Sequence, residues 1–254
     1  MEGNNYAKRK NMKDFYENIK DSDECLIYKY YSPSEYSLDA LINQYFWFSK
    51  REFLNDPFDL GNFKAGKDLL TVINVLAKNY GEEIDVEKIS NNILDYASCS
   101  FTNSELDKQM WAYYAQDYHG WCLAFQRGEM NTKNESPLSP VIYVSDDLKP
   151  IFPQLNYQKY GNDNNENLIR RILCTKHESW KHEQEERMVI KMKGKNTGDK
   201  RAWGTYELKH IVIGNKMNSP YKQIILTMAK MLNINVYEIV LNNMNFSLDK
   251  RRLL

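Results

Sequence analysis

The sequence predicts an α+β protein with a single domain. Helices flank a mixed β-sheet, which is either continuous or split into two parts. Short runs rich in β-branched and aromatic residues alternate irregularly with helical periodicities, unlike the regular alternation of a βαβ fold. A length of 254 residues is enough to bury a large core without disulfides or a structural metal. We expect this domain at residues 23–245, with a helical extension at 1–22 and a frayed basic tail at 246–254.

Local patterns place the individual elements. Aromatic and β-branched runs predict strands, in chain order, at residues 25–30, 45–48, 97–102, 121–125, 141–144, 187–191, 208–213 and 235–241. Apolar residues at i, i+3 and i+4 spacing predict helices behind the start signal Ser32–Ser34 and at residues 67–80, 86–94, 106–118, 168–173 and 220–232. Residues 54–59 form a loop, because Pro57 removes an amide donor and disfavours helical backbone at Asp56. Gly120 ends the helix at 106–118.

Composition excludes several classes of protein. The chain has 34 Lys and Arg against 34 Asp and Glu, whereas a dedicated duplex-DNA binder usually carries a basic field. Apolar runs stay far below the roughly 18 residues of a membrane span, and the first residues lack the apolar core of a signal peptide. The scattered cysteines have no metal-ligand spacing and are typical of buried, reduced thiols. We therefore expect a soluble cytoplasmic protein.

The segment Trp180–Arg187 is the most informative in the chain. If a strand starts by residue 183, period-2 alternation places Glu183, Glu185 and Arg187 on one face of it. Two carboxylates on one face repel each other unless a cation or a ligand lies between them. Arg187 can supply that charge, so a structural ion network is the alternative to a catalytic pair.

Two other clusters combine polar and aromatic residues. Asn55–Asp59 is typical of a side-chain-capped turn, although its two acids could also position a ligand or a metal. Met110, Tyr113 and Tyr114 share one helical face, which is more often core than a cofactor site. His119 either caps the end of that helix or lies at the rim of a site. Glycine-rich phosphate loops and the G-x-S-x-G elbow are absent from the sequence.

The order of several blocks resembles the uncharacterised bacterial family named domain of unknown function 2971. The blocks span roughly residues 26–214 and comprise Leu26–Tyr30, Phe48–Ser49, Phe53–Asp59, Met110–Tyr114, His119–Phe125, Val141-x-Tyr143 and Trp180–Arg187. The family carries no established general activity. Its members occur among phage-defence and toxin-like genes, so the resemblance implies a toxin or defence effector with a possible partner protein in a defence system.

A second resemblance is to the three signature strands of ADP-ribosyltransferases. It implies a first strand with Lys29 or Tyr30, a middle strand with Ser100 and Thr102, and a late strand with Glu183 and Glu185. The sequence departs from that pattern, because no Arg or His occupies the first strand and Ser-Phe-Thr replaces Ser-Thr-Ser.

This second resemblance also implies a reaction. NAD would be the substrate, and a macromolecule, either protein or nucleic acid, would accept its ADP-ribose. Glu185 would stabilise the positive charge that develops on the ribose, and Glu183 would orient or deprotonate the acceptor. Trp111 and Tyr114 would stack on the ligand, and Arg187 would complete the NAD site.

Two further functions remain open at this point. A metal-dependent nuclease could use Asp56, Asp59, Glu183 and Glu185 as oxygen ligands for Mg²⁺. Its basic substrate path would consist of Lys191, Lys193, Lys195, Lys200 and Arg201, which are otherwise typical of a solvated hairpin between Gly194 and Gly204. A non-catalytic sensor or interaction module would use the same clusters as structural features.

Overall fold

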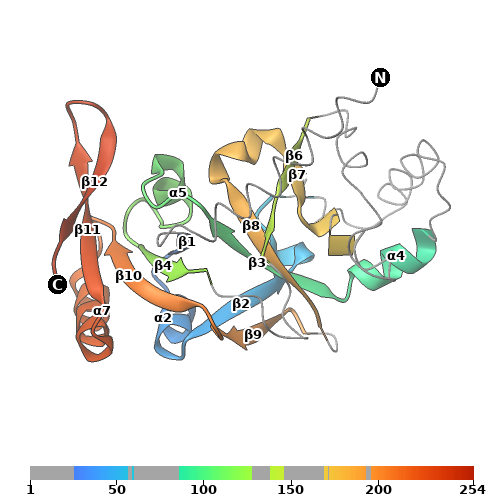
Figure 1. Cartoon of the computed structure of the whole chain (residues 1–254), viewed down its shortest axis with the longest axis horizontal. Helices are drawn as coiled ribbons and strands as arrows, with labels where there is room; N and C mark the ends of the chain where they lie inside the picture. The colour runs from blue at the N-terminus through green and yellow to red at the C-terminus, as the bar shows by residue number, and fades with distance from the viewer. Residues whose placement is uncertain are drawn as a thin grey trace, which may run out of the picture.

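The structure is a computed structural model that describes residues 26–56, 59, 86–127, 138–145, 169, 170, 172–192 and 196–254. Its strands are β1 (Leu26–Tyr31), β2 (Tyr45–Lys50), β3 (Tyr96–Thr102), β4 (Trp121–Gln126), β5 (Ser139–Pro140), β6 (Ile142–Val144), β7 (Thr175–His177), β8 (Glu185–Lys191), β9 (Gly198–Ala202), β10 (Glu207–Ile213), β11 (Asn235–Asn242) and β12 (Ser247–Arg252). Its helices are α2 (Glu35–Ile42), α4 (Val86–Ile93), α5 (Lys108–Tyr113) and α7 (Ser219–Leu232), with short 3₁₀ helices η1 (Arg51–Phe53) and η4 (Glu178–Glu183). The predicted α+β class is confirmed (Figure 1).

One large sheet organises the described residues. Its neighbouring strands follow the order β12-β11-β10-β4-β1-β3-β2-β9, while β8 pairs with β3 and β5 pairs with β8. Strands β10 and β11 are parallel and the other pairs of this sheet are antiparallel, so the sheet is mixed, as predicted. A separate parallel pair, β6 and β7, lies beside β8 (Figure 1).

Strand β3 changes partners along one of its edges. Near its end it pairs with β1 through Tyr28 and Thr102, and near its start it pairs with β2 through Ala97 and Ser98. Between these points β1 and β2 diverge, and the carbonyl of Ser100 accepts a hydrogen bond from Lys29 Nζ at 3.0 Å. The opposite edge of β3 pairs continuously with β8 from Tyr96 to Thr102. Beside Ser100, this edge of β3 therefore pairs with neither of the described strands β1 and β2.

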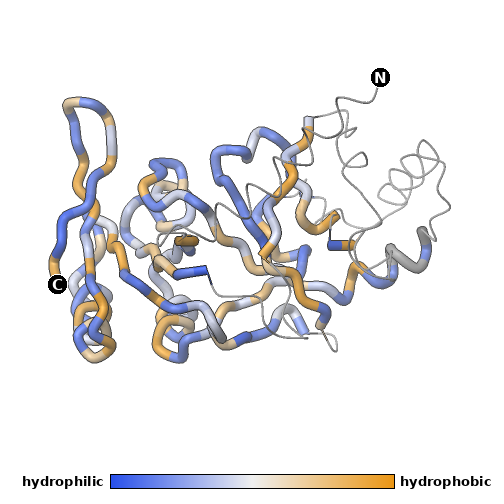
Figure 2. Tube along the Cα trace, in the orientation of Figure 1, coloured by the Kyte–Doolittle hydropathy of each residue, from blue (hydrophilic) through white to orange (hydrophobic). Residues whose placement is uncertain are grey.

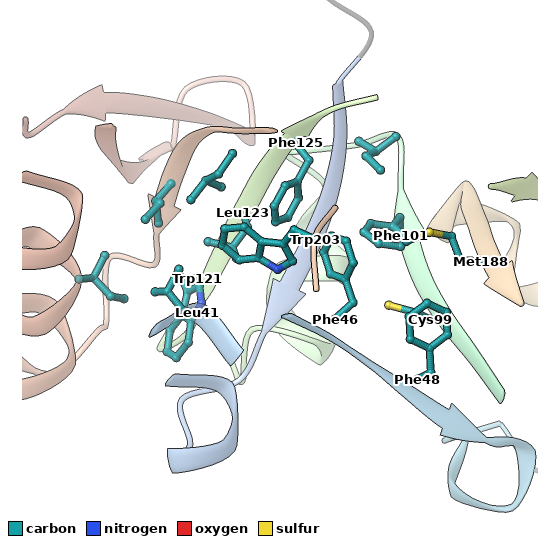
Figure 3. Close-up of a cluster of buried hydrophobic side chains, with 14 of the residues drawn as sticks. Leu41, Phe46, Phe48, Cys99, Phe101, Trp121, Leu123, Phe125, Met188 and Trp203 are labelled. Carbon is teal, nitrogen blue, oxygen red and sulfur yellow. The ribbon is translucent and has the colours of Figure 1, made fainter. Parts of the chain in front are cut away.

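The main hydrophobic core covers one face of the sheet. Phe46 lies at its centre and makes edge contacts with the rings of Phe101 and Phe125, at centroid distances of 5.0 and 5.1 Å (Figure 3). Residues of α2 and α7 pack into the same core. Figure 2 shows apolar stretches along the central strands, whereas η4 and the start of β8 are hydrophilic. The hydrophilic stretch nevertheless contains buried side chains, which makes it unusual.

A second, smaller cluster lies around the short helix α5. It combines Trp111 and Ala115 with Cys122, Val212, Ile239 and Leu248 from β4 and β10–β12. The predicted helix at 106–118 is wrong in its extent, because α5 ends at Tyr113 and residues 116–118 have positive φ angles of 47°, 51° and 66°. His119 caps this turn, with Nδ1 2.9 Å from the carbonyl oxygen of Gln116.

Two edge strands differ from the sequence-based prediction. The tail does not fray, because residues 247–252 form β12, which pairs antiparallel with β11 and buries Leu248. The segment predicted as a solvated hairpin contains β9, which pairs with β2. Among the described residues, no helix has the length and apolar character needed to cross a membrane. The predicted helices at 1–22 and 67–80 lie outside the described residues.

Candidate functional site

The acidic segment before β8 turns sharply into the strand. Glu183 ends the 3₁₀ helix η4, Gln184 adopts a left-handed conformation with φ 44° and ψ 47°, and Glu185 is the first residue of β8. The expectation that a strand already includes Glu183 is therefore corrected. Glu183 reaches the same place as Glu185 through the turn at Gln184 and not through strand alternation.

Strand register brings the predicted middle and late strands together. Thr102 lies opposite Glu185, and Ser100 lies opposite Arg187. Tyr28 of the first strand lies opposite Thr102, so Tyr28, Thr102 and Glu185 form one line across three neighbouring strands. Directly opposed side chains lie on the same face of a sheet, which is the face away from the Phe46 core.

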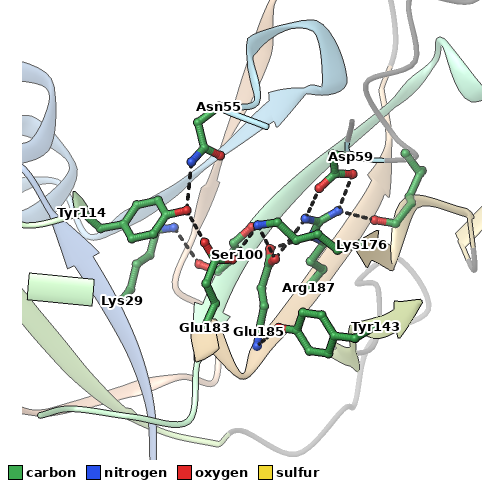
Figure 4. Close-up of polar contacts among 11 residues, drawn as sticks. Lys29, Asn55, Asp59, Ser100, Tyr114, Tyr143, Lys176, Glu183, Glu185 and Arg187 are labelled. Carbon is green, nitrogen blue, oxygen red and sulfur yellow. Dashed lines mark hydrogen bonds and ion pairs between the residues drawn. The ribbon is translucent and has the colours of Figure 1, made fainter. Parts of the chain in front are cut away.

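Glu185 lies in a buried ion cluster that has Arg187 on one side and Lys176 on the other (Figure 4). Arg187 Nε donates to Glu185 Oε1 at 2.6 Å, and Lys176 Nζ donates to Glu185 Oε2 at 3.2 Å. The same ammonium donates to Glu183 Oε2 at 2.5 Å. Arg187 also makes a bidentate pair with Asp59 and donates to the carbonyl of Leu173 at 2.6 Å. Three carboxylates thus face two cations within this ion cluster.

The two glutamates ionise differently. Burial opposes ionisation of Glu185, but Arg187 and Lys176 outweigh it and lower its pKa to about 2. Burial raises the pKa of Glu183; Lys176 lowers it and the charge of Glu185 raises it, leaving it above its usual value. Burial also opposes the charge of Lys176, yet the two glutamates keep its pKa raised. One carboxyl is therefore held ionised beside a second carboxyl that can accept a proton.

Tyr114 connects this ion cluster to the surface. Its hydroxyl donates to Glu183 Oε1 and accepts a hydrogen bond from Nδ2 of the exposed Asn55 at 2.9 Å (Figure 4). Burial and the neighbouring charge of Glu183 raise the pKa of the Tyr114 hydroxyl, so it stays protonated and acts as a donor. A line of hydrogen bonds consequently runs from Asn55 through Tyr114 and Glu183 to Lys176.

Three other residues border the ion cluster. The Tyr143 hydroxyl accepts a hydrogen bond from the Glu185 backbone amide at 2.8 Å, which holds the start of β8 against β6. Lys29 approaches Ser100 from the first strand, but its ammonium bonds the Ser100 carbonyl and lies over the Phe101 ring at 5.2 Å. Ser100 itself makes a side-chain hydrogen bond that helps to lower the pKa of Glu185.

Tyr30 and Trp111 are not brought into contact with the ion cluster. Tyr30 donates to the carbonyls of Ser104 and Glu105 at 3.0 and 2.6 Å, and its ring meets Trp111 edge-on at a centroid distance of 5.3 Å. Trp111 is fully buried, and its indole N–H donates to the Glu105 carbonyl at 2.9 Å. Both side chains hold the second core cluster together, while Tyr113 is 64% exposed and points away from it.

Two of the four acids considered as metal ligands, Asp59 and Glu185, are paired with a cation of the chain. Asp59 and Glu185 already accept hydrogen bonds from Arg187, and the described residues contain no group of three acidic, His or Cys side chains able to hold a metal ion. Lys200 and Arg201 pair with Asp39 and Asp199 at the surface, and Lys193 and Lys195 lie outside the described residues. A shallow depression of about 670 Å³ beside Lys200 lies at the β2–β9 edge and not at the ion cluster.

Two partners of the ion cluster are not marked by local patterns, although the metal-dependent alternative grouped one of them, Asp59, with Glu183 and Glu185. Lys176 lies in the three-residue strand β7, which is too short to show a period, and no motif marks it. Asp59 is separated from Arg187 by 128 positions in the chain. The one available signal was the repulsion expected between Glu183 and Glu185, which required a cation between them. The structure provides Lys176 in that place.

Comparison with known proteins identifies one similarity. The profile of the family described as protein of unknown function (DUF2971) matches residues 110–188. No curated protein and no solved structure matches the chain. The matched segment contains Tyr114, Lys176, Glu183, Glu185 and Arg187, which make up most of the ion cluster and its link to the surface. The resemblance of this chain to DUF2971 is therefore confirmed over residues 110–188.

Proposed function

We propose that this protein is an NAD-consuming enzyme, an ADP-ribosyltransferase or NAD glycohydrolase, acting as a bacterial toxin or phage-defence effector. The observation that carries the proposal is the buried pair of carboxyl groups at Glu183 and Glu185, of which one is held ionised and the other can accept a proton. Among the described residues, the carboxylates of Glu183, Glu185 and Asp59 meet two cations of the chain, Lys176 and Arg187. A buried site rich in carboxylates favours a cationic ligand or transition state.

NAD provides such a positive charge at the bond that breaks. As the bond between ribose and the cationic nicotinamide ring breaks, its electron pair leaves with nicotinamide and positive charge develops on the ribose. Glu185, with a pKa of about 2, stays ionised throughout and stabilises that charge. The acceptor, water or a nucleophilic group of a macromolecule, bonds to the ribose and gives its proton to Glu183, whose pKa is raised.

The strand arrangement supports the same proposal. The resemblance to ADP-ribosyltransferases assigns roles to a first, a middle and a late strand, and β1, β3 and β8 are direct neighbours in that order. The sheet opens between β1 and β2 beside Ser100, and Tyr114 presents a half-buried aromatic ring at the outer end of the ion cluster. Tyr114 takes the stacking role in the proposal, because Trp111 is closed off in the core.

The test measures free nicotinamide after incubation of the purified protein with NAD. Glu185→Gln and Glu183→Gln should each lower the rate per folded molecule by about 100-fold or more. Glu186→Gln is the matched control, because Glu186 is the next residue of β8, is equally buried, and pairs with Arg127 instead of the ion cluster. Failure of the wild-type protein to release nicotinamide or to label any acceptor would end the proposal.

One observation favours a second function, a non-catalytic sensor or interaction module. Both oxygens of Glu185 accept hydrogen bonds from cations of the chain itself, as in a structural ion network. Melting temperature alone does not separate the two functions, because removal of one partner from a buried ion cluster destabilises the fold in either case. A folded Glu183→Gln, Glu185→Gln double variant that keeps the cellular phenotype supports the module, and loss of the phenotype supports the enzyme.

A further inference from the structure

Arg51 is a buried cation that lacks a partner in the described part of the chain. It is the first residue of η1 and only 8% exposed, yet its Nη1 has no hydrogen-bond partner. The other two guanidinium groups described above differ from it, since Arg187 meets Asp59 and Glu185, and Arg127 meets Glu186. A guanidinium stays protonated under all ordinary conditions, so its burial without a hydrogen-bonded counter-charge is costly, although the charge of the neighbouring Glu52 offsets part of that cost. Such a cost is expected where a ligand supplies the missing anion.

The position of Arg51 relates it to the ion cluster. It follows β2 directly, whose last residue, Lys50, lies opposite Ala97 of β3. Glu185 lies opposite Thr102, five residues further along the same strand, which corresponds to roughly 17 Å. The segment that begins at Arg51 continues to Asn55, which bonds the Tyr114 hydroxyl at the outer end of the ion cluster. The length of β3 from Ala97 to Thr102 therefore separates the end of β2, next to Arg51, from the acidic pair.

We propose that Arg51 binds a phosphate group of the ligand whose glycosidic bond lies at Glu183 and Glu185. The planar guanidinium presents a fork of donors that matches two oxygens of a phosphate, and charge-assisted hydrogen bonds of this kind are strong in a buried site. In a dinucleotide such as NAD a phosphate is attached to the same ribose whose glycosidic bond breaks, so one ligand carries both of the groups that Arg51 and the acidic pair would bind. The claim that the ligand reacts at Glu183 and Glu185 rests on the proposed function. The claim that a phosphate binds here depends only on Arg51.

The ligand-free protein provides the first test. Arg51→Met keeps the length of the side chain and removes a buried charge that has no partner, so the melting temperature should stay level or rise. Arg127→Met is the matched control, because it leaves the buried Glu186 without its cation and should lower the melting temperature. A fall with Arg51→Met as large as that with Arg127→Met would overturn the proposal, since Arg51 would then be a structural cation.

Binding of ADP, measured by calorimetry, provides the second test. ADP carries two phosphates and no nicotinamide bond, so its binding does not depend on turnover. The wild-type protein and Arg127→Met should bind ADP equally, whereas Arg51→Met should bind it about tenfold more weakly or worse. Adenosine, which has no phosphate, should bind equally weakly to wild type and Arg51→Met. Absence of ADP binding to the wild type, or equal binding by Arg51→Met, would overturn the phosphate site.

The two proposals fail separately. Glu185→Gln should bind ADP as the wild type does, because Glu185 acts on the ribose bond and not on the phosphates. If ADP binding depends on Arg51 but the wild type releases no nicotinamide from NAD, the phosphate site stands and the proposed reaction is wrong. If the wild type releases nicotinamide but Arg51→Met binds ADP as tightly as the wild type does, the proposed reaction stands and the proposed role of Arg51 is wrong.

Discussion

Glu183 and Glu185 share one cation: Lys176 Nζ lies 2.5 Å from Glu183 Oε2 and 3.2 Å from Glu185 Oε2. The two carboxylates differ in what surrounds them. Glu185 has a second cation in Arg187, while Glu183 has the neutral hydroxyl of Tyr114. The lower pKa of Glu185 and the higher pKa of Glu183 follow from this difference. Residues two positions apart in the chain thus have opposite preferences for a proton.

Removal of the shared cation should destabilise the protein in a pH-dependent way. We expect Lys176→Met to lower the free energy of unfolding at pH 7 by about 3–5 kcal/mol, because two buried carboxylates lose a common partner. Without Lys176 the pKa of Glu183 rises further, and a raised carboxyl pKa costs stability as the pH rises through it. The loss should therefore be smaller at pH 5 than at pH 8, as measured by urea unfolding. An equal loss at both pH values would show that Lys176 contributes no charge to the ion cluster. Lys200→Met, at an exposed pair with Asp39, should leave the free energy of unfolding almost unchanged, because exposed ion pairs contribute little.

Acid should weaken the fold through Glu185. Its pKa is lowered from the usual 4.5 to about 2, so ionised Glu185 stabilises the folded state above pH 4.5, and that contribution disappears as the pH falls toward 2. The expected contribution is roughly 3 kcal/mol, from the shift in pKa. Because other carboxyls such as Glu105 also have lowered pKa values, the measurement is the difference in unfolding free energy between wild type and Glu185→Gln. That difference should shrink between pH 5 and pH 2. A difference independent of pH would contradict the ionised, paired state of Glu185.

Local patterns in the sequence predict the central part of the fold well. Strands such as β3, β4 and β10 bury much of one or both faces, so their apolar and aromatic residues mark them. Helix α7 is marked at both ends, with Asn218 as its N-cap and a left-handed Asn233 as its C-cap. The edge strands β9 and β12 carry mostly polar, exposed side chains, so they resemble loops in sequence. They are strands because a neighbouring backbone pairs with them.

The candidate site is predictable only in part, for a similar reason. The two-residue spacing of Glu185 and Arg187 correctly places both side chains on one face of β8, because that relationship is local. The partners Lys176 and Asp59 come from distant segments, and nothing within a few residues of either one reveals the contact. Trp111 shows the converse error. The sequence places Trp111 at the ligand, as a stacking residue. The side chain is buried in the core instead, because α5 turns that side inward.

The packing of β12 gives a direct test of the C-terminal strand. Leu248 is 7% exposed in the second core cluster, so Leu248→Ala should lower the free energy of unfolding by about 2–3 kcal/mol. The control is Met244→Ala in the turn between β11 and β12, where the side chain is 96% exposed and the change should stay within about 0.5 kcal/mol. Thermal or urea unfolding measures both. Equal effects of the two substitutions would mean that residues 247–252 do not pack as a strand.

The hydroxyl of Tyr114 provides the sharpest test of the line of hydrogen bonds that reaches Glu183. Tyr114→Phe keeps the ring and removes the donor to Glu183 Oε1, so the pKa of Glu183 should rise further. If Glu183 accepts the proton of the acceptor, nicotinamide release at neutral pH should fall, and the acidic limb of its pH profile should move to higher pH. Stability should fall by only about 1 kcal/mol, the net value of one hydrogen bond. Tyr113→Phe is the control, because the neighbouring ring is 64% exposed and away from the ion cluster, and its pH profile should match the wild type. A Tyr114→Phe profile that also matches the wild type would show that Glu183 takes no part in the proton transfer.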